Sequence, residues 1–188
     1  MTDPKIHVLY IDDEDNNLKS FRATLRKDFK IFTAIDGEEG LRIAQEEEIH
    51  VVIADQRMPG MTGTEFFVKM VEINPDPIRI LLTGYSDIAS VIDAINKGEV
   101  YRFIDKPWNI EQIKNSIKNA ADIFFMRREL KEKNQKLQKK RKHQNKVAEQ
   151  KKKKAFLIIQ LFVKSEEQQP VSLQEVYWVL WDWVEDPD

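Results

Sequence analysis

Five side chains suited to chemistry follow apolar runs of strand length. Asp12 and Asp13 come after IHVLYI, Asp55 follows HVVIA, Thr83 ends IRILLT, and Lys106 comes shortly after VYRFI. If the runs are parallel strands, their carboxyl ends meet at one edge of a sheet, and these groups converge there. Two carboxylates about 4 Å apart repel by roughly 4 kcal/mol at an effective dielectric constant of about 20. A hard divalent cation with oxygen ligands relieves that repulsion, and Mg²⁺ suits such a site. A metal, a lysine and a hydroxyl together suit a phosphoryl group.

Strand-like and helix-like patterns alternate through the first 122 residues. The apolar runs occupy 6–11, 29–34, 50–54, 78–83 and 100–104, and apolar residues at helical spacing follow each of them. This alternation predicts an α/β fold in which a doubly wound, five-stranded parallel sheet is covered by helices on both faces.

The charge of the chain separates three regions. Residues 1–122 carry a net charge of −7, residues 123–154 carry +11 and residues 155–188 carry −6. We interpret them as a sheet-forming domain, a basic helical stalk and an apolar helical C-terminal module. Cysteine is absent, which excludes disulfides and thiolate sites. No signal-peptide pattern and no apolar run of membrane-spanning length occurs, so a cytoplasmic protein is expected.

Four motifs make the first region resemble the receiver domain of bacterial two-component response regulators. They are YIDDE at 10–14, IADQRMPGMTGTEF at 53–66, LLTGYSD at 81–87 and VYRFIDKPW at 100–108. The resemblance implies a flavodoxin-like fold. It also implies a phosphorylation-dependent signalling switch that takes a phosphoryl group from a sensor histidine kinase or a phosphotransfer protein.

The resemblance gives each motif position a role. Asp55 corresponds to the phosphoacceptor and Lys106 to the lysine that contacts the phosphoryl group, and the bond between Lys106 and Pro107 is expected to be cis. Thr83 and Tyr101 correspond to the switch hydroxyl and the switch aromatic residue. Such a domain catalyses its own Mg²⁺-dependent phosphotransfer and dephosphorylation, and no separate catalytic output domain is expected. The expected ligands of Mg²⁺ (or Mn²⁺) are Asp12, Asp13, Asp55 and the backbone carbonyl of Arg57.

The basic region predicts a long helix, because neither Gly nor Pro occurs between Asn109 and Pro170. In one heptad register Ile123, Leu130 and Leu137 hold position d and Asn134 holds position a, which favours a marginal parallel homodimer. A solitary solvated helix or a partly disordered linker is one alternative. DNA binding through the positive charge is another, although no motif that reads bases is visible.

The C-terminal module is too short to form a strong core alone. It contains AFLIIQLFV at 155–163, and Ser172 with Glu175 forms a capping-box signal for a last helix. We expect this module to bury its apolar side chains against the same module of a second chain or against a partner protein. Membrane docking is the alternative, and the acidic residues among the tryptophans disfavour it. The expected contact residues of the module are Tyr177, Trp178, Leu180, Trp181 and Trp183.

Overall fold

The computed structural model describes residues 5–84, 100–166 and 174. The chain forms two compact units, residues 1–129 and 130–188. Two predicted elements lie outside the described residues. One is the helix between the fourth and fifth strands, and the other is the last helix with Tyr177, Trp178, Leu180, Trp181 and Trp183.

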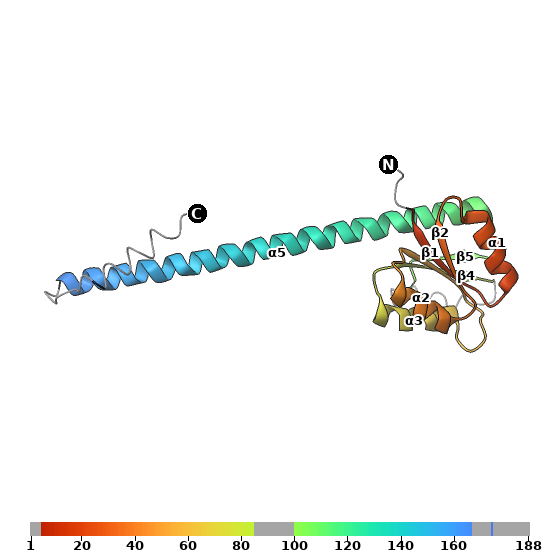
Figure 1. Ribbon diagram of the computed structural model, residues 1–188, viewed down its shortest axis with the longest axis horizontal. Helices are drawn as coiled ribbons and strands as arrows, with labels where there is room; N and C mark the ends of the chain where they lie inside the picture. The colour runs from red at the N-terminus through yellow and green to blue at the C-terminus, as the bar shows by residue number, and fades with distance from the viewer. Residues whose placement is uncertain (1–4, 85–99, 167–173, 175–188) are drawn as a thin grey trace. The chain divides into compact units, whose positions relative to one another are not determined.

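The first unit contains the predicted five-stranded parallel sheet, with the strand order β2-β1-β3-β4-β5 (Figure 1). The five strands are β1 (His7–Ile11), β2 (Lys30–Ala34), β3 (Val51–Asp55), β4 (Ile78–Thr83) and β5 (Arg102–Asp105). The helices are α1 (Asp15–Leu25), α2 (Gly37–Glu46), α3 (Gly63–Ile73) and α5 (Ile110–Glu166). The flavodoxin-like fold class predicted from the sequence is confirmed.

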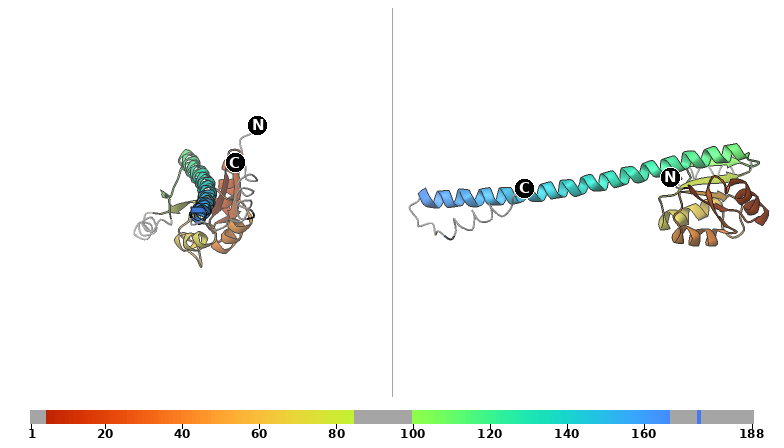
Figure 2. Two further views of the ribbon diagram at one scale, coloured as in Figure 1. Left: turned by 90° about the vertical axis from the view of Figure 1, so that its left-hand side faces the viewer. Right: turned by 45° about the horizontal axis from the view of Figure 1, so that its top comes forward.

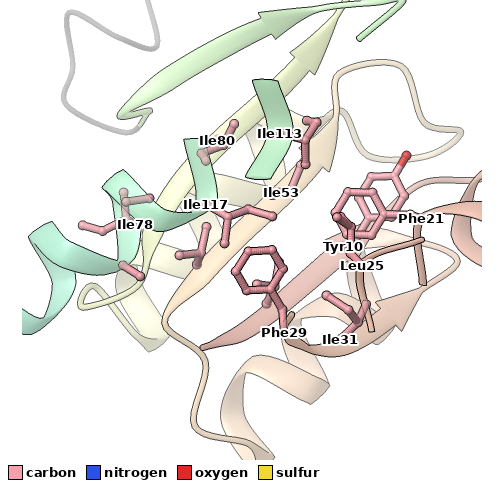
Figure 3. Packing of buried hydrophobic residues seen from close by; sticks show 14 of the residues in the cluster. Tyr10, Phe21, Leu25, Phe29, Ile31, Ile53, Ile78, Ile80, Ile113 and Ile117 are labelled. Carbon is pink, nitrogen blue, oxygen red and sulfur yellow. The ribbon is translucent and has the colours of Figure 1, made fainter. Parts of the chain in front are cut away.

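Successive strand residues face opposite layers of the unit. Val8 and Tyr10 of β1 pack in the layer of α1 and the start of α5, while Leu9 and Ile11 pack in the layer of α2 and α3. Figures 1 and 2 show these helices on the two faces of the sheet, and Figure 3 shows the packing of the first layer. Helices on both faces bury every residue of the central strand β3, whereas the edge strands β2 and β5 keep exposed residues. Burial on both faces accounts for the nearly continuous apolar runs of the inner strands.

Polar residues fix the starts of the helices near the strand ends. Thr62 and Glu65 form a reciprocal capping box at the start of α3. Asn109 Oδ1 accepts a hydrogen bond of 2.7 Å from the backbone N–H of Gln112 in the first turn of α5. These caps set where each helix leaves the loop that follows a strand.

Helix α5 is a single helix of 57 residues, as the absence of Gly and Pro in this region predicted. Ile113, Ile117, Ala120 and Phe124 share one buried face against the sheet. From Phe125 to residue 160 every described side chain is at least partly exposed. The helix is continuous across the predicted boundaries at 122 and 154, and these boundaries remain predictions. No helix in the described ranges has the length and hydropathy needed to cross a bilayer.

Candidate functional site

The carboxyl end of the sheet brings together three of the predicted site residues. Lys106 Nζ lies 2.8 Å from Asp55 Oδ1 and 3.3 Å from Asp12 Oδ2. Lys106 and Asp12 directly follow β5 and β1, and Asp55 is the last residue of β3, so residues 94 positions apart in the chain meet at one point. Asp12 is 1% exposed and Asp55 is 7% exposed, whereas the side chain of Lys106 is 32% exposed. The site is therefore a pair of buried carboxylates bridged by an ammonium group that solvent reaches.

Both oxygens of Asp12 accept hydrogen bonds. Oδ1 accepts from the backbone N–H of Glu14 at 3.0 Å and from Asn17 Nδ2 at 2.9 Å. Oδ2 accepts from the hydroxyl of Tyr10 at 2.5 Å and from Lys106 Nζ at 3.3 Å. Four donors hold this carboxylate in one orientation.

The two carboxylates differ in basicity. Burial raises the pKa of Asp12, but hydrogen bonds from Tyr10 and Asn17 outweigh this and hold the pKa below its usual value. Burial also raises the pKa of Asp55, and Lys106 only partly offsets the effect, so the pKa of Asp55 lies above its usual value. Burial lowers the pKa of Lys106, but the neighbouring Asp55 and Asp12 outweigh it and the pKa is raised. Lys106 is therefore held as a cation, and Asp55 is the more basic of the two carboxyl groups.

Two glycines shape the loop that follows Asp55. Gly60 has a φ of 78°, in the left-handed region that other residues rarely adopt. A side chain at Gly63 would collide with the backbone carbonyl oxygen of Asp55, and its Cβ would lie 2.7 Å from Leu81 Cδ1. Glycine at position 63 thus lets the start of α3 approach the end of β3.

The oxygen groups expected to bind a metal ion are in two environments. Asp12 and Asp55 are buried, while Asp13, the residue after Asp12, is exposed to solvent. Within residues 5–84, 100–166 and 174, no three Asp, Glu or His side chains are grouped closely enough to hold a metal ion. Three carboxylates and the Arg57 carbonyl are nevertheless hard oxygen donors of the kind that Mg²⁺ prefers, so the donor set fits this ion.

The two predicted switch residues lie at opposite ends of the parallel pair β4–β5, in which Thr83 pairs with Asp105 and Tyr101 lies beside Arg79. Thr83, the last residue of β4, is 1% exposed, and its hydroxyl donates to the Gly84 carbonyl at 3.2 Å. Tyr101 comes just before β5 and is 43% exposed. The peptide bond between Lys106 and Pro107 is cis.

The described residues predicted for self-association lie on α5, outside the sheet unit. Leu130 and Leu137 are 60% and 58% exposed, and Asn134 is exposed. Their exposure leaves these side chains accessible in a single chain.

Sequence reasoning missed Tyr10 and Asn17 as members of the site. Tyr10 lies two residues before Asp12, on the same side of β1, and this spacing was the available signal. Asn17 lies in α1 and reaches back five positions to Asp12.

A flavodoxin-like sheet with buried carboxylates and a lysine at its carboxyl end defines a receiver-type signalling domain. Residues 8–118 match the response regulator receiver domain. The chain therefore belongs to the response regulator receiver family.

Similar proteins match the first part of the chain. The hydrogenase transcriptional regulatory protein HoxA of Bradyrhizobium diazoefficiens is 30% identical over 65% of this chain and 25% of its own length. The probable chemotaxis protein CheY of Rhizobium etli is 37% identical over 60% of this chain and 90% of its own length. A response regulator receiver domain structure from Clostridium thermocellum is 31% identical and has a TM-score of 0.61, covering 64% of this chain and 98% of that one.

The chain spans about a quarter of the length of HoxA, so the similarity concerns the receiver domain alone. Receiver domains are phosphorylation-dependent signalling switches and generally use Mg²⁺.

Proposed function

We propose that Asp55 accepts a phosphoryl group from a phosphohistidine on a sensor histidine kinase or a phosphotransfer protein. The observation that carries this proposal is the 2.8 Å contact between Asp55 Oδ1 and the partly exposed Lys106 Nζ, at the carboxyl end of the sheet. A carboxylate oxygen of Asp55 forms the new bond to phosphorus. The bond between phosphorus and the histidine nitrogen breaks, and the nitrogen keeps the electron pair.

The ammonium group of Lys106 stabilises negative charge on the phosphoryl oxygens during transfer. It already contacts Asp55, and its raised pKa keeps it protonated. A phosphoryl group on Asp55 would draw Lys106 toward its oxygens, which changes the contact that Lys106 makes with Asp12. Catalysis of this kind depends on positioning and charge rather than on a separate acid or base.

The proposed ligands of Mg²⁺ (or Mn²⁺) are Asp12, Asp13, Asp55 and the Arg57 carbonyl. When bound, the ion supplies positive charge that offsets the charge of the phosphoryl oxygens. Four hydrogen bonds fix the orientation of Asp12. A cation bound to Oδ2 would take the place of the longest of them, the 3.3 Å contact with Lys106. The same site is proposed to hydrolyse the aspartyl phosphate, so the domain resets itself.

Thr83 and Tyr101 are proposed to transmit the phosphorylated state. The hydroxyl of Thr83 now donates to the Gly84 carbonyl, and rotation would let it donate to a phosphoryl oxygen instead. Tyr101 is 43% exposed, and its backbone N–H donates to the Arg79 carbonyl at 2.9 Å, so it would respond to a shift of β4 and β5 rather than by filling the space of the hydroxyl. The charge added at Asp55 would thereby change the surface near β5.

The output is proposed to be a change in self-association or in the binding of a partner protein. The exposed side chains of Leu130, Asn134 and Leu137 on α5 support a homodimer of parallel helices. The exposed Phe156 and Ile159 add apolar surface at the start of the C-terminal module. The cytoplasmic location expected from the sequence belongs to this proposal.

The proposal is tested by phosphorylation with acetyl phosphate and Mg²⁺, followed by the intact mass of the chain. Wild type should gain one phosphoryl group, and Asp55→Asn should gain none. Asp105→Asn is the matched control, because Asp105 is an exposed carboxylate at the end of β5 on the same sheet edge. It should be phosphorylated like wild type. Equal phosphorylation of Asp55→Asn and wild type would refute the assignment.

A further inference from the structure

The hydroxyl of Tyr10 makes a buried contact with the candidate site. Tyr10 is 1% exposed, and its hydroxyl donates to Asp12 Oδ2 at 2.5 Å. A hydrogen bond from a hydroxyl to a carboxylate is among the stronger polar contacts in proteins, and 2.5 Å lies at the short end of its range. The same oxygen accepts from Lys106 at 3.3 Å. Tyr10 and Lys106 therefore share one acceptor atom.

The ring of Tyr10 is fixed by packing. It stacks on Phe21 with a centroid separation of 4.2 Å and an interplanar angle of 26°. Phe21 in turn meets Trp108 edge-on at 6.0 Å, and Trp108 follows Lys106 by two residues. Figure 3 shows the rings of Tyr10 and Phe21 side by side in the apolar layer. A phenylalanine would fill the same space, so the hydroxyl is the part of Tyr10 that packing does not require.

We propose that Tyr10 is a positioning residue that holds the Asp12 carboxylate, through its hydroxyl, in the orientation that binds a divalent cation. The inference rests on the proposed function, because it assigns Tyr10 to the metal-binding part of that site. Asp12 itself would contact the cation, and Tyr10 acts only through Asp12. Asp12 and Asp55 both contact Lys106, so the orientation of Asp12 also bears on where Lys106 lies.

The physical reason is the number of donors on each oxygen. With the hydroxyl, Oδ2 has two donors and Oδ1 has two. Without it, Lys106 is the one remaining donor among these to Oδ2, so this oxygen is held less firmly, and by the same ammonium group that a cation would displace. Loss of a hydrogen bond to a metal-binding carboxylate commonly lowers metal affinity by about 10- to 100-fold.

The test measures Mg²⁺ binding directly by isothermal titration calorimetry, with the full chain and no phosphodonor. Tyr10→Phe, which keeps the ring and removes the hydroxyl, should raise the dissociation constant for Mg²⁺ by about tenfold. Asn17→Ala removes a donor from the other oxygen and should also raise it.

Phe29→Leu is the control for packing damage, because Phe29 is buried in the same apolar layer and has no hydrogen bond to Asp12. It should lower the midpoint of thermal unfolding and leave the Mg²⁺ dissociation constant within about twofold of wild type, since only its packing changes.

Three results overturn the inference. The first is a Mg²⁺ dissociation constant of Tyr10→Phe within about twofold of the wild-type value, because loss of the hydrogen bond should raise this constant by about tenfold or more. The second is Phe29→Leu that weakens Mg²⁺ binding as much as Tyr10→Phe does. The third is wild type that binds no Mg²⁺. Acetyl phosphate labelling of the same proteins separates the two proposals: phosphorylated wild type with unchanged Mg²⁺ affinity in Tyr10→Phe refutes only the role of Tyr10.

Discussion

The two ends of the sheet both gather titratable side chains, but they use them in opposite ways. At the carboxyl end Asp12 and Asp55 share the cation of Lys106, so two negative groups meet one positive group. At the amino end His7 and His50 stack with their ring centroids 4.9 Å apart and an interplanar angle of 9°. One end concentrates charge, and the other pairs aromatic rings.

The amino end satisfies its own polar groups. The backbone N–H of His7 donates to His50 Nδ1 at 3.1 Å, and His7 Nδ1 lies 2.6 Å from the Glu48 carbonyl oxygen. The ring of His50 also meets Phe124 and Phe125 of α5, each with a centroid separation of 4.9 Å. These contacts tie the packed part of α5 to the ends of β1 and β3.

The difference separates a site for a ligand from a structural joint. Lys106 is partly exposed and lies among carboxylates that repel one another. Such a group of charges can bind a cation or a phosphoryl group. His50 is 5% exposed, and burial lowers its pKa, so it is held neutral. Burial of a titratable group therefore does not by itself mark a functional site, and the charge balance around the group is the more informative feature.

The largest expected effect falls on the carboxyl end. Lys106→Met keeps the length of the side chain and removes the ammonium group, so phosphorylation by acetyl phosphate should slow by about 100-fold or more. Lys114→Met is the matched control: Lys114 lies on α5 and pairs with Asp28 at 2.9 Å, at a partly buried position away from the proposed phosphoacceptor. Rates are measured from the intact mass against time. A Lys106→Met rate equal to that of Lys114→Met would place the catalytic charge elsewhere.

An intermediate effect is expected at the amino end, in the dependence of stability on pH. The pKa of His50 is lowered by burial and by the nearby His7, so the unfolded chain takes up this proton more readily than the folded one. The contribution of His50 to the free energy of unfolding is then fully present above the unfolded pKa of about 6.5. It is lost as the pH drops toward the lower folded pKa, by at most about 1.4 kcal/mol per pH unit.

Urea unfolding between about pH 7.5 and 5.5 measures this slope across the unfolded histidine pKa. His50→Phe keeps an aromatic ring and removes the titrating group, so its slope should be shallower than that of wild type. His143→Gln changes an exposed histidine of α5 and should keep the wild-type slope. Identical slopes for wild type and His50→Phe would show that folding does not hold the His50 imidazole neutral.

The smallest effect is expected for the ion pair of Glu48 with Arg128, at the rim of the amino end. The two side chains are 57% and 54% exposed, so solvent screens their attraction. A double-mutant cycle of Glu48→Gln and Arg128→Gln should give a coupling energy of about 0.2–1 kcal/mol in urea unfolding. A coupling energy above about 2 kcal/mol would contradict this expectation, because exposed ion pairs usually contribute much less to the stability of a fold.

The sequence predicted the sheet and the carboxyl end well, because strand ends in a parallel sheet converge whatever the details of packing. Strands β4 and β5 lie between Asp55 and Lys106 in the chain, and the two side chains still meet. The length of α5 was likewise predictable from the absence of Gly and Pro.

The remaining contacts depend on side-chain directions and on strand neighbours. The hydroxyl of Tyr10 reaches Asp12 only because both lie on one side of β1 and Asp12 turns inward, whereas the adjacent Asp13 is exposed. The pairing of His7 with His50 required the register of β1 and β3, in which Val8 lies beside Val51. Local sequence patterns predict neither the strand order nor the directions of these side chains.

The most direct test of the central claim locates the acyl phosphate itself. The chain is phosphorylated with acetyl phosphate and Mg²⁺ and treated with borohydride, which reduces an acyl phosphate of aspartate to homoserine. Peptide sequencing by mass spectrometry should then find homoserine at position 55, with Asp12 and Asp13 unchanged. Homoserine at position 12 or 13, or at no position, would contradict the account.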